Sequence, residues 1–380
     1  MSWECRTVEE QRKAFVLAAL SSSNFSAVCR EFGITRKTGY KWLSRYEDGL
    51  ALSDLDKTPH SIPNKTPEAI ERRILHYRDQ YNWGARTIHQ VLANQNCPNL
   101  PCVKTVNNIL NRCGRIAPEE SLKHKPYIQF AKEHCNDMWQ TDFKGEFLME
   151  NGRYCNPLDI LDDSSRFLLK IAPFENTVNV VIPTFKQAFL EYGLPRSILS
   201  DNGGQFAGFR QGYTQFEKWL MDLDILPIHG RIKHPQTQGK IERFHRSMKN
   251  ELLKQRTFTD IVDADLAFQE WREVYNTVRP HEALNMRCPA EVYEKSSRTY
   301  PDSIKKYEYS GEYHVIKVNN WGYVRFAGYQ VYLSETMIGE YIEFRQSLDG
   351  NTLDAYYRNF RIAQFDVTNG KRLNRSIYRV

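Results

Sequence analysis

Residues 139–150 alternate between apolar and polar side chains with a period of two. This alternation predicts a β-strand with one buried and one solvated face, and it places Asp142 on the face opposite the aromatic side chains. Asn151-Gly152 follows, a dipeptide suited to a tight hairpin turn. We therefore expect a returning strand, at about 153–160, to lie beside the first.

Further strands and helices alternate after this hairpin. Apolar runs predict strands at about 166–171, 197–200 and 225–228, and longer amphipathic patterns predict helices at about 177–192, 210–222, 238–254 and 262–278. This order of elements predicts an α/β RNase H-like core over residues 126–295. Asp201 directly follows a strand and so lies at the carboxyl edge, where open α/β sheets place their working groups.

Three carboxylates are candidates for chemistry at this edge. Asp142 lies on the first strand, Asp201 ends a later strand, and Glu242 lies beside the apolar stripe of the helix at 238–254. Arg246 and Lys249 share the helix face of Glu242. Converging carboxylates repel one another unless cations intervene, and such hard oxygen ligands suit two Mg²⁺ ions, for which Mn²⁺ is an expected substitute.

The first 49 residues have the pattern of three short helices. Asn24 and Thr35 are good caps for the second and third helices, and Gly33 ends the second. A helix, a turn with glycine and a basic helix are typical of a helix-turn-helix module, although an ordinary three-helix bundle remains the alternative. The candidate DNA-contact residues of the third helix are Arg36, Lys37, Tyr40, Lys41 and Arg45.

A second helical module follows a linker. Periodicity is lost over residues 50–65, which contain two prolines and predict an extended linker. Residues 66–125 then carry a second set of helices, predicted at about 67–80, 84–94 and 102–113. Lys104 and Arg112 on the last of these are further candidate DNA contacts. Two such modules on one linker would raise DNA affinity through effective concentration.

The C-terminal part, residues 296–380, changes to a period of two. Five short strands are predicted between residues 315 and 357, and they favour a small β-barrel of the SH3-like kind. The basic segment at 371–375 favours a DNA contact by this barrel. The chain is thus predicted to be multidomain, with two all-α helix-turn-helix modules, an α/β core and a barrel.

The composition agrees with a DNA-binding protein that is not a membrane protein. Of the 380 residues, 41% are hydrophobic and 26% are charged, which is typical of globular chains. The net charge is +6, and the excess of Lys and Arg lies at the two ends, around a slightly acidic middle. No apolar run reaches membrane-spanning length and no signal peptide is visible, so we expect a cytoplasmic, nucleoid-associated protein.

The eight cysteines include no C-x-x-C pair. Cys97, Cys102 and Cys113 lie near His89 and His124, but their spacing does not match a common zinc module. The sequence therefore favours reduced thiols in the core over a zinc site.

Several blocks of the sequence resemble one known family. Trp139-Gln-Thr-Asp142, Ser200-Asp-Asn-Gly203 and His234-Pro-Gln-Thr-Gln-Gly-Lys-Ile-Glu242-Arg-Phe-His245 are similar to the signature blocks of DDE transposases and retroviral integrases. Tyr275-Asn-x-x-Arg-Pro-His281 and Leu284 are similar to the tail of bacterial insertion-sequence transposases. Between the signature acids lie 58 and then 40 residues, and the longer second interval indicates a small insertion near 207–214.

The resemblance implies a site and an activity. Asp142, Asp201 and Glu242 would be the catalytic metal ligands, Lys249 would be the basic residue that the family keeps after the Glu, and Asp162 and Asp163 would support their own loop. The implied protein is a Mg²⁺-dependent DNA transposase. It would bind the inverted-repeat ends of its element, free 3′-hydroxyls and join them to target DNA by transesterification.

The implied partners are double-stranded DNA, as element ends and as target, and further copies of the chain in at least a dimer on DNA. We see no Ser/His or Cys/His pairing near the core, in keeping with chemistry that needs no protein nucleophile. Two alternatives remain open. One is a nuclease of the same fold that only hydrolyses DNA, and the other is a DNA-binding regulator with an inactive core.

Overall fold

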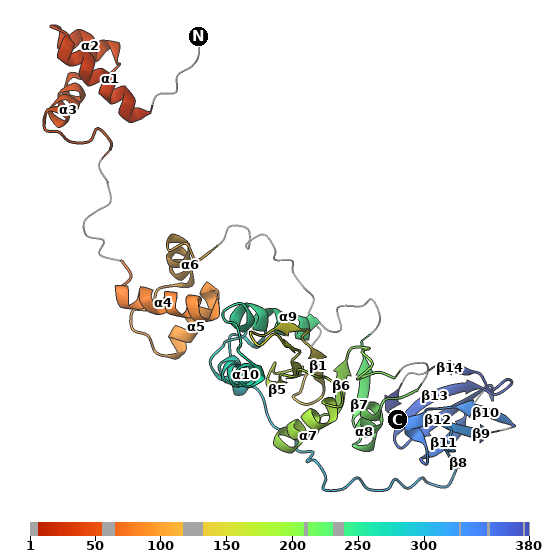
Figure 1. Cartoon of the computed structure of the whole chain (residues 1–380). Helices are drawn as coiled ribbons and strands as arrows, with labels where there is room; N and C mark the ends of the chain where they lie inside the picture. Colours follow the sequence, from red (N-terminus) through yellow and green to blue (C-terminus); the bar gives the residue numbers. More distant parts are fainter. Residues whose placement is uncertain are drawn as a thin grey trace. The chain divides into compact units, whose positions relative to one another are not determined.

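The computed structural model describes residues 7–54, 65–116, 132–208, 212–230, 239–326, 328–347, 350–374 and 377–379. Most of the predicted linker, the end of the predicted second module, motif residues 231–238 and Arg375 lie outside these ranges. The chain forms two compact units, Met1–Lys65 and Thr66–Val380 (Figure 1). No helix among the described residues is long and apolar enough to cross a membrane.

The first unit is a bundle of three helices, α1 (Val8–Ser21), α2 (Phe25–Glu31) and α3 (Arg36–Glu47). The predicted caps are confirmed, because the side chains of Asn24 and Thr35 accept hydrogen bonds from the first turns of α2 and α3. Phe15 and Trp42 are buried between the helices. A Cβ atom at Gly39 would lie 2.8 Å from the Cys29 sulfur, so glycine is required where α3 meets α2.

The second unit begins with the second helical module. Its helices are α4 (Glu68–Tyr81), α5 (Ala85–Asn94) and α6 (Val103–Arg112), each within one residue of its predicted bounds. Their apolar faces enclose Ile74, Ile88 and Val106, and Val274 and Val278 pack against the same cluster. The module therefore shares a hydrophobic contact with the long helix that follows residue 260.

A five-stranded sheet in the order β5-β4-β1-β6-β7 is the centre of the second unit. The strands β1, β4 and β5 are antiparallel, whereas β6 and β7 continue the sheet in parallel with β1. This mixed sheet with helices on both faces is the predicted RNase H-like core. The strands are β1 (Trp139–Phe143), β4 (Leu158–Asp162), β5 (Leu168–Ala172), β6 (Ser197–Ser200) and β7 (Leu226–His229).

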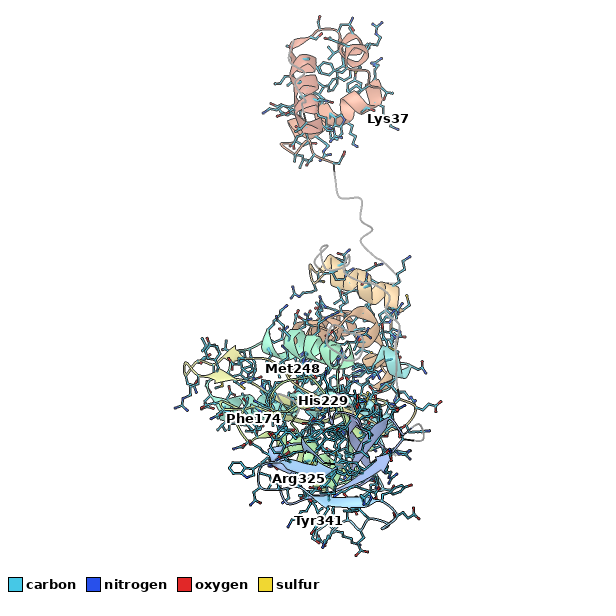
Figure 2. The ribbon with its side chains drawn as sticks, turned by 90° about the vertical axis from the view of Figure 1, so that its right-hand side faces the viewer. Lys37, Phe174, His229, Met248, Arg325 and Tyr341 are labelled. Atoms are coloured by element: carbon cyan, nitrogen blue, oxygen red, sulfur yellow. The ribbon has the colours of Figure 1, made fainter. Side chains whose placement is uncertain are left out.

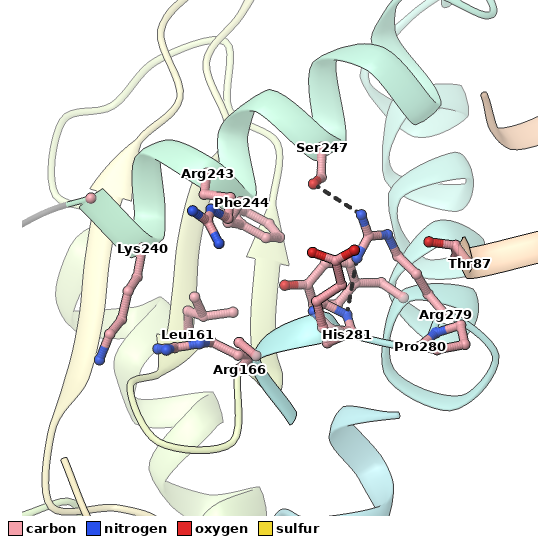
Figure 3. Close-up of a pocket in the computed structure, with 14 residues that line it drawn as sticks. Thr87, Leu161, Arg166, Lys240, Arg243, Phe244, Ser247, Arg279, Pro280 and His281 are labelled. Carbon is pink, nitrogen blue, oxygen red and sulfur yellow. Dashed lines mark hydrogen bonds between the residues drawn. The ribbon is translucent and has the colours of Figure 1, made fainter. Parts of the chain in front are cut away.

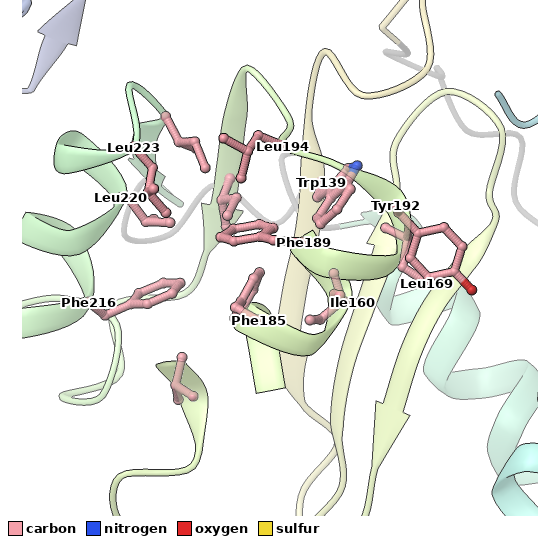
Figure 4. Close-up of a cluster of buried hydrophobic side chains, with 14 of the residues drawn as sticks. Trp139, Ile160, Leu169, Phe185, Phe189, Tyr192, Leu194, Phe216, Leu220 and Leu223 are labelled. Atoms are coloured by element: carbon pink, nitrogen blue, oxygen red, sulfur yellow. The ribbon is translucent and has the colours of Figure 1, made fainter. Parts of the chain in front are cut away.

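Helices cover both faces of this sheet. One face packs Trp139 and Ile198 against Phe189 and the other apolar side chains of α7 and α8 (Figure 4). The opposite face packs Leu161 and Leu168 against α9 and α10. The helices are α7 (Val181–Tyr192), α8 (Gln215–Asp222), α9 (Gly239–Met248), which continues into a π-helical turn (Lys249–Leu253), and α10 (Ile261–Thr277).

Two details of the first predicted hairpin are wrong. Its second face is not solvated, because α9 and α10 cover it and Gln140 is 2% exposed. The strand also does not run to residue 150. It ends at Phe143, and a separate small hairpin of β2 (Phe147–Leu148) and β3 (Tyr154–Cys155) turns at Gly152, whose positive φ of 78° suits glycine.

The entry into β6 is held by the segment that follows the core. Gly193 ends α7 with φ 79°, and a Cβ atom there would lie 2.7 Å from the carbonyl oxygen of Arg298. The backbone N–H of Leu194 donates to that same oxygen. This close backbone approach requires glycine and fixes where β6, and therefore Asp201, begins.

The C-terminal part is built from antiparallel sheets. One has the order β14-β13-β12-β11-β8, with β15 paired to β13, and the other pairs β9 with β10. Closure into an SH3-like barrel stays a prediction, and three strands after residue 357 were not predicted. The strands are β8 (His314–Lys317), β9 (Tyr323–Phe326), β10 (Tyr329–Tyr332), β11 (Tyr341–Gln346), β12 (Thr352–Tyr357), β13 (Phe360–Asp366), β14 (Arg372–Asn374) and β15 (Tyr378–Arg379). Short 3₁₀ turns occur at Glu282–Leu284, Pro289–Glu291 and Glu335–Met337.

Candidate active site

Three aspartates lie in a row across the central sheet. Asp142 is directly opposite Asp159 in the antiparallel pair of β1 and β4. On its other side, β1 pairs in parallel with β6, and Gln140 lies opposite Leu199. Asp142 and Asp201 each lie two residues further along their strands, so they are level with each other. Because side chains alternate along strands, all three carboxylates belong to the sheet face that α9 covers.

Asp142 is under electrostatic strain from burial and from its neighbours in the row. Burial raises the pKa of its carboxyl to about 6, His245 opposes this shift, and the charges of Asp201 and Asp159 add to it. Its side chain retains 23% of its exposure. A carboxylate that is half desolvated beside two others is a position that favours a bound cation.

Asp159 and His245 were not identified from the sequence as part of this site. Asp159 is fully buried, and one of its oxygens lies 2.7 Å from Nε2 of His245. The other oxygen, Oδ1, has no hydrogen-bond partner among the described residues. Nδ1 of His245 lies 4.0 Å from Asp142, so the imidazole lies between the two carboxylates. An Asp inside an apolar strand was the one signal that pointed to this pair.

Asp201 is held by a tight turn at the end of β6. Its Oδ1 accepts a hydrogen bond from the N–H of Gly203 at 2.9 Å, and a Cβ atom on Gly203 would approach that oxygen to 3.0 Å. Asn202 donates to the carbonyl oxygen of Gly230 at 2.7 Å and so ties the turn to the segment after β7. The carboxylate therefore keeps its second oxygen for other ligands.

A series of buried, hydrogen-bonded polar side chains supports this turn. The hydroxyl of Ser200 lies 3.2 Å from Nδ1 of His229, whose Nε2 lies 2.9 Å from the buried carboxylate of Glu217. The expectation of no Ser/His pairing near the core was therefore wrong. Ser200 is 2% exposed and can also donate to the carbonyl oxygen of Asp201, which makes it a support rather than a nucleophile.

Glu242, the third predicted ligand, is exposed in the first turn of α9. His245 lies one turn further along the same helix and contacts Asp159, which anchors α9 beside the row of aspartates. Among the described residues no three His, Cys, Asp or Glu side chains lie close enough together to hold a metal ion. The structure thus brings Asp142 and Asp201 together and leaves Glu242 outside their group.

The loop after β4 is held by its own two aspartates, as predicted. Asp162 accepts hydrogen bonds from the N–H of Asn136 and from both the N–H and the hydroxyl of Ser165. Asp163 accepts from Gln140 at 2.6 Å and forms an ion pair with Lys240. Neither side chain is available as a metal ligand.

The predicted DNA-contact residues of α3 are mostly at the surface. Arg36, Lys37, Tyr40 and Lys41 are exposed, and Lys37 points away from the bundle (Figure 2). Arg45 is half-buried, and its guanidinium carbon lies 5.2 Å from the centre of the Trp42 ring, which the Nζ atom of Lys41 also approaches to 4.9 Å.

In the second unit, Lys104, Arg246 and Lys249 are exposed. Arg112 forms an ion pair with Glu71 at 2.7 Å, so it is less free to bind DNA than predicted.

Most described cysteines occupy the core. Cys29, Cys97, Cys155 and Cys288 are buried, whereas Cys102 is exposed at the N-cap of α6. No described cysteine forms a disulfide bond.

Comparison with known families decides what this core is. Residues 132–235 and 223–289 match sequence models described as integrase core domain, and residues 11–60 match a helix-turn-helix domain. The central domain is an integrase core. The resemblance to transposases of bacterial insertion sequences and to retroviral integrases is thereby confirmed.

Proteins similar to this chain include proteins of mobile elements. The chain is 25% identical over 238 residues to a 39.2 kDa protein of insertion element IS476 from Xanthomonas euvesicatoria, covering 60% of this chain and 66% of that protein. It is 25% identical over 296 residues to the transposase for transposon Tn552 from Staphylococcus aureus, and the match covers 67% of this chain and 58% of that protein.

Retroviral proteins are also similar to parts of this chain. The Gag-Pro-Pol polyprotein of Mason-Pfizer monkey virus is 33% identical over 121 residues, covering 31% of this chain and 6% of that one. The HTLV-2 integrase catalytic core, solved in complex with magnesium, is 19% identical and covers 42% of this chain and 97% of its own, with a TM-score of 0.33.

The strain on Asp142 predicts a stability change. A carboxyl whose folded pKa of about 6 exceeds its ordinary 3.8 opposes folding when it ionises. This cost is absent below about pH 4 and complete above about pH 7. Without divalent metal, Asp142→Asn should therefore stabilise the protein at neutral pH by roughly 1–3 kcal/mol and leave it unchanged at acid pH.

The measurement is the thermal unfolding midpoint against pH in the presence of EDTA. Asp302→Asn, a change at an exposed position, is the matched control, and its unfolding midpoint should follow that of the wild type at every pH. An Asp142→Asn protein that is no more stable than the wild type at neutral pH would show that Asp142 carries no such strain.

Proposed function

We propose that this protein is a DNA transposase. It binds the inverted-repeat ends of its element, cleaves there to free 3′-hydroxyls, and joins those hydroxyls to target DNA by metal-dependent transesterification. The observation that carries the proposal is the pair of Asp142 and Asp201 at the carboxyl edge of an integrase core, with the first carboxyl raised in pKa by burial and by its neighbours.

The residues present suit a divalent cation. Asp142 and Asp201 offer hard oxygen ligands, and the free oxygen of Asp201 and the strained carboxyl of Asp142 belong to one face of the sheet. Glu242 lies one helical turn before His245, whose Nδ1 is 4.0 Å from Asp142, and in this proposal it joins the two aspartates as a third carboxylate when the metal binds. Two Mg²⁺ ions bound there, or Mn²⁺ in their place, would activate the attacking oxygen and stabilise the leaving oxygen of an in-line displacement.

The protein's own residues position these groups. The sheet fixes the spacing between Asp142 and Asp201, the turn at Gly203 orients Asp201, and the contact of His245 with Asp159 holds α9 against the site. Because the strands are packed on buried apolar clusters, Asp142 and Asp201 need little rearrangement when DNA binds.

DNA recognition belongs to the helix-turn-helix domain in this proposal. The basic helix α3 presents Arg36, Lys37 and Lys41 to solvent, which is the arrangement that enters a major groove. Lys104, Arg246 and Lys249 offer further contacts, and the C-terminal sheets, if they close as a barrel, offer another surface. Joining two ends requires at least two copies of the chain on the DNA, and these act in the cytoplasm at the nucleoid.

If the three carboxylates bind the metal ions, changing them should abolish catalysis and leave DNA binding intact. Asp142→Asn, Asp201→Asn and Glu242→Gln each keep the side-chain shape but remove a negative ligand. Each should lower cleavage and strand transfer in Mg²⁺ by at least about a hundredfold, because the metal would no longer be placed on both sides of the phosphate. Binding to DNA carrying the terminal repeats that flank the reading frame should remain at the wild-type level.

The assay measures cleavage, strand transfer and end binding on the same labelled DNA. Products of hydrolysis without strand transfer in the wild type would favour a nuclease. End binding with no reaction in Mg²⁺ or Mn²⁺ would favour a regulator. Cleavage at a near wild-type rate by one of the variants would remove that residue from the ligand set.

The helix-turn-helix domain predicts a salt effect. Changing Arg36, Lys37 and Lys41 together to Ala should weaken end binding and flatten its dependence on salt by about 0.9 per lost phosphate contact, since each contact releases a counterion. The check is a binding titration at several salt concentrations. Lys186→Ala, on α7, is the control, and equal slopes for all three proteins would mean that α3 does not bind the DNA.

A further inference from the structure

A pocket lies on the side of α9 away from the carboxylates. Its volume is about 210 Å³, and it is bounded by α9, by the segment after α10 and by α5 of the second helical module (Figure 3). The residues of α9 that line the pocket are Lys240, Arg243, Phe244 and Ser247. Because an α-helix turns by about 100° per residue, these four side chains share one side of α9, whereas Glu242 and Lys249 lie on the opposite side.

The pocket is lined by cationic side chains. Lys240 and Arg243 reach it from α9, and Arg166 reaches it from the loop after β4. Arg166 is 8% exposed and donates to the carbonyl oxygen of Asp163, whose carboxylate pairs with Lys240. The part of the chain that the structure describes offers Arg243 no hydrogen bond or ion pair, although it is a lining residue.

These three cations are poorly compensated. Burial lowers the pKa of Arg166, and the charge of Arg243 adds to this shift, while the carboxylates of Asp163 and Asp162 oppose it only in part. An anion placed among the three side chains would relieve their repulsion.

The other wall of the pocket is electrically balanced. Arg279 pairs with Glu251 at 2.8 Å and donates to Ser247. His281 is neutral, because burial and the neighbouring Arg279 hold its pKa well below the usual range. The positive excess therefore lies at the end formed by Arg166, Lys240 and Arg243.

The shape of the surface favours a phosphate group that is part of a nucleic-acid chain. A second cleft shares Thr87 and Glu282 with the pocket and is lined also by Arg86, Lys104 and Asn107 of the helical module. The two clefts adjoin at Thr87 and Glu282, so a mainly basic surface extends from α6 to α9. Among the described residues its one acidic lining residue, Glu282, lies 3.5 Å from Arg86. Arginine forks match phosphate oxygens, and a basic path with hydroxyl and amide groups suits a nucleic-acid backbone.

We propose that this pocket binds a backbone phosphate of DNA that runs along the second helical module. The inference rests on the proposed function, since it assumes that the protein handles DNA. A phosphate held by Arg243, Lys240 and Arg166 would fix the duplex against α9, the same helix that carries Glu242 on its other side. The pocket would thereby set the distance between bound DNA and the carboxylates.

The test compares Arg243→Gln and Lys240→Gln with the exposed Lys186→Gln on α7, which removes the same charge elsewhere. Full-length proteins are titrated with labelled duplex DNA at several salt concentrations. Each pocket variant should bind roughly tenfold more weakly than the control at moderate salt. Each should also show a salt slope smaller by about 0.9.

A second arm locates the contact. Duplexes with one neutral methylphosphonate linkage are scanned along the strand. One position should weaken binding by the wild type and have no effect on Arg243→Gln, because the contact is already lost. Arg243 is exposed, so this variant should unfold at the wild-type temperature.

The outcomes separate the two proposals. A wild-type protein that binds no DNA would overturn the proposed function and this inference with it. Normal DNA binding with pocket variants equal to the control would overturn the inference alone. If inorganic phosphate raises the unfolding temperature of the wild type but not of Arg243→Gln, while DNA affinity is unchanged, the pocket takes a free anion and the DNA assignment is wrong.

Discussion

The parallel pairing of β1 with β6 is the constraint on which the candidate active site depends. Gln140 lies opposite Leu199, and this register makes Asp142 and Asp201 neighbours although 58 residues separate them in sequence. The pairing is enforced from one side by the apolar cluster around Trp139 and Phe189. A slip of one residue would move both Trp139 and Asp142 to the wrong faces, so packing and chemistry select the same register.

Helix α9 connects the parts of the molecule that would meet DNA. Its apolar stripe packs on the sheet, His245 contacts the buried Asp159, and Glu242 remains exposed beside the carboxylate row. The opposite flank of the helix carries Lys240 and Arg243 into a pocket that Thr87 of the second helical module also lines. Negative and positive groups are thus separated across one helix, as the proposed function requires of an element with metal ions on one side and a DNA backbone on the other.

Much of this arrangement could be predicted from the sequence. The helices capped by Asn24 and Thr35 and the strand that ends before Asp201 follow from local patterns. The role of the two aspartates that hold the loop after β4 follows from the family resemblance. The contribution of Asp159 could not be predicted. Its register with Asp142 depends on a small hairpin inserted between their strands, and only packing sets where that hairpin begins. The burial of the second sheet face was missed for a related reason, since α9 and α10 come about a hundred residues later.

The most direct test of the account is the position of Mn²⁺ in crystals of the full chain bound to a DNA end, found by anomalous scattering. The account predicts a peak within coordination distance of carboxylate oxygens from both Asp142 and Asp201, at about 2.0–2.4 Å, with Glu242 turned toward it. The same experiment on Asp201→Asn should lose or weaken that peak. Bound DNA with Mn²⁺ ions only elsewhere, and with the two aspartates free of metal, would contradict the account.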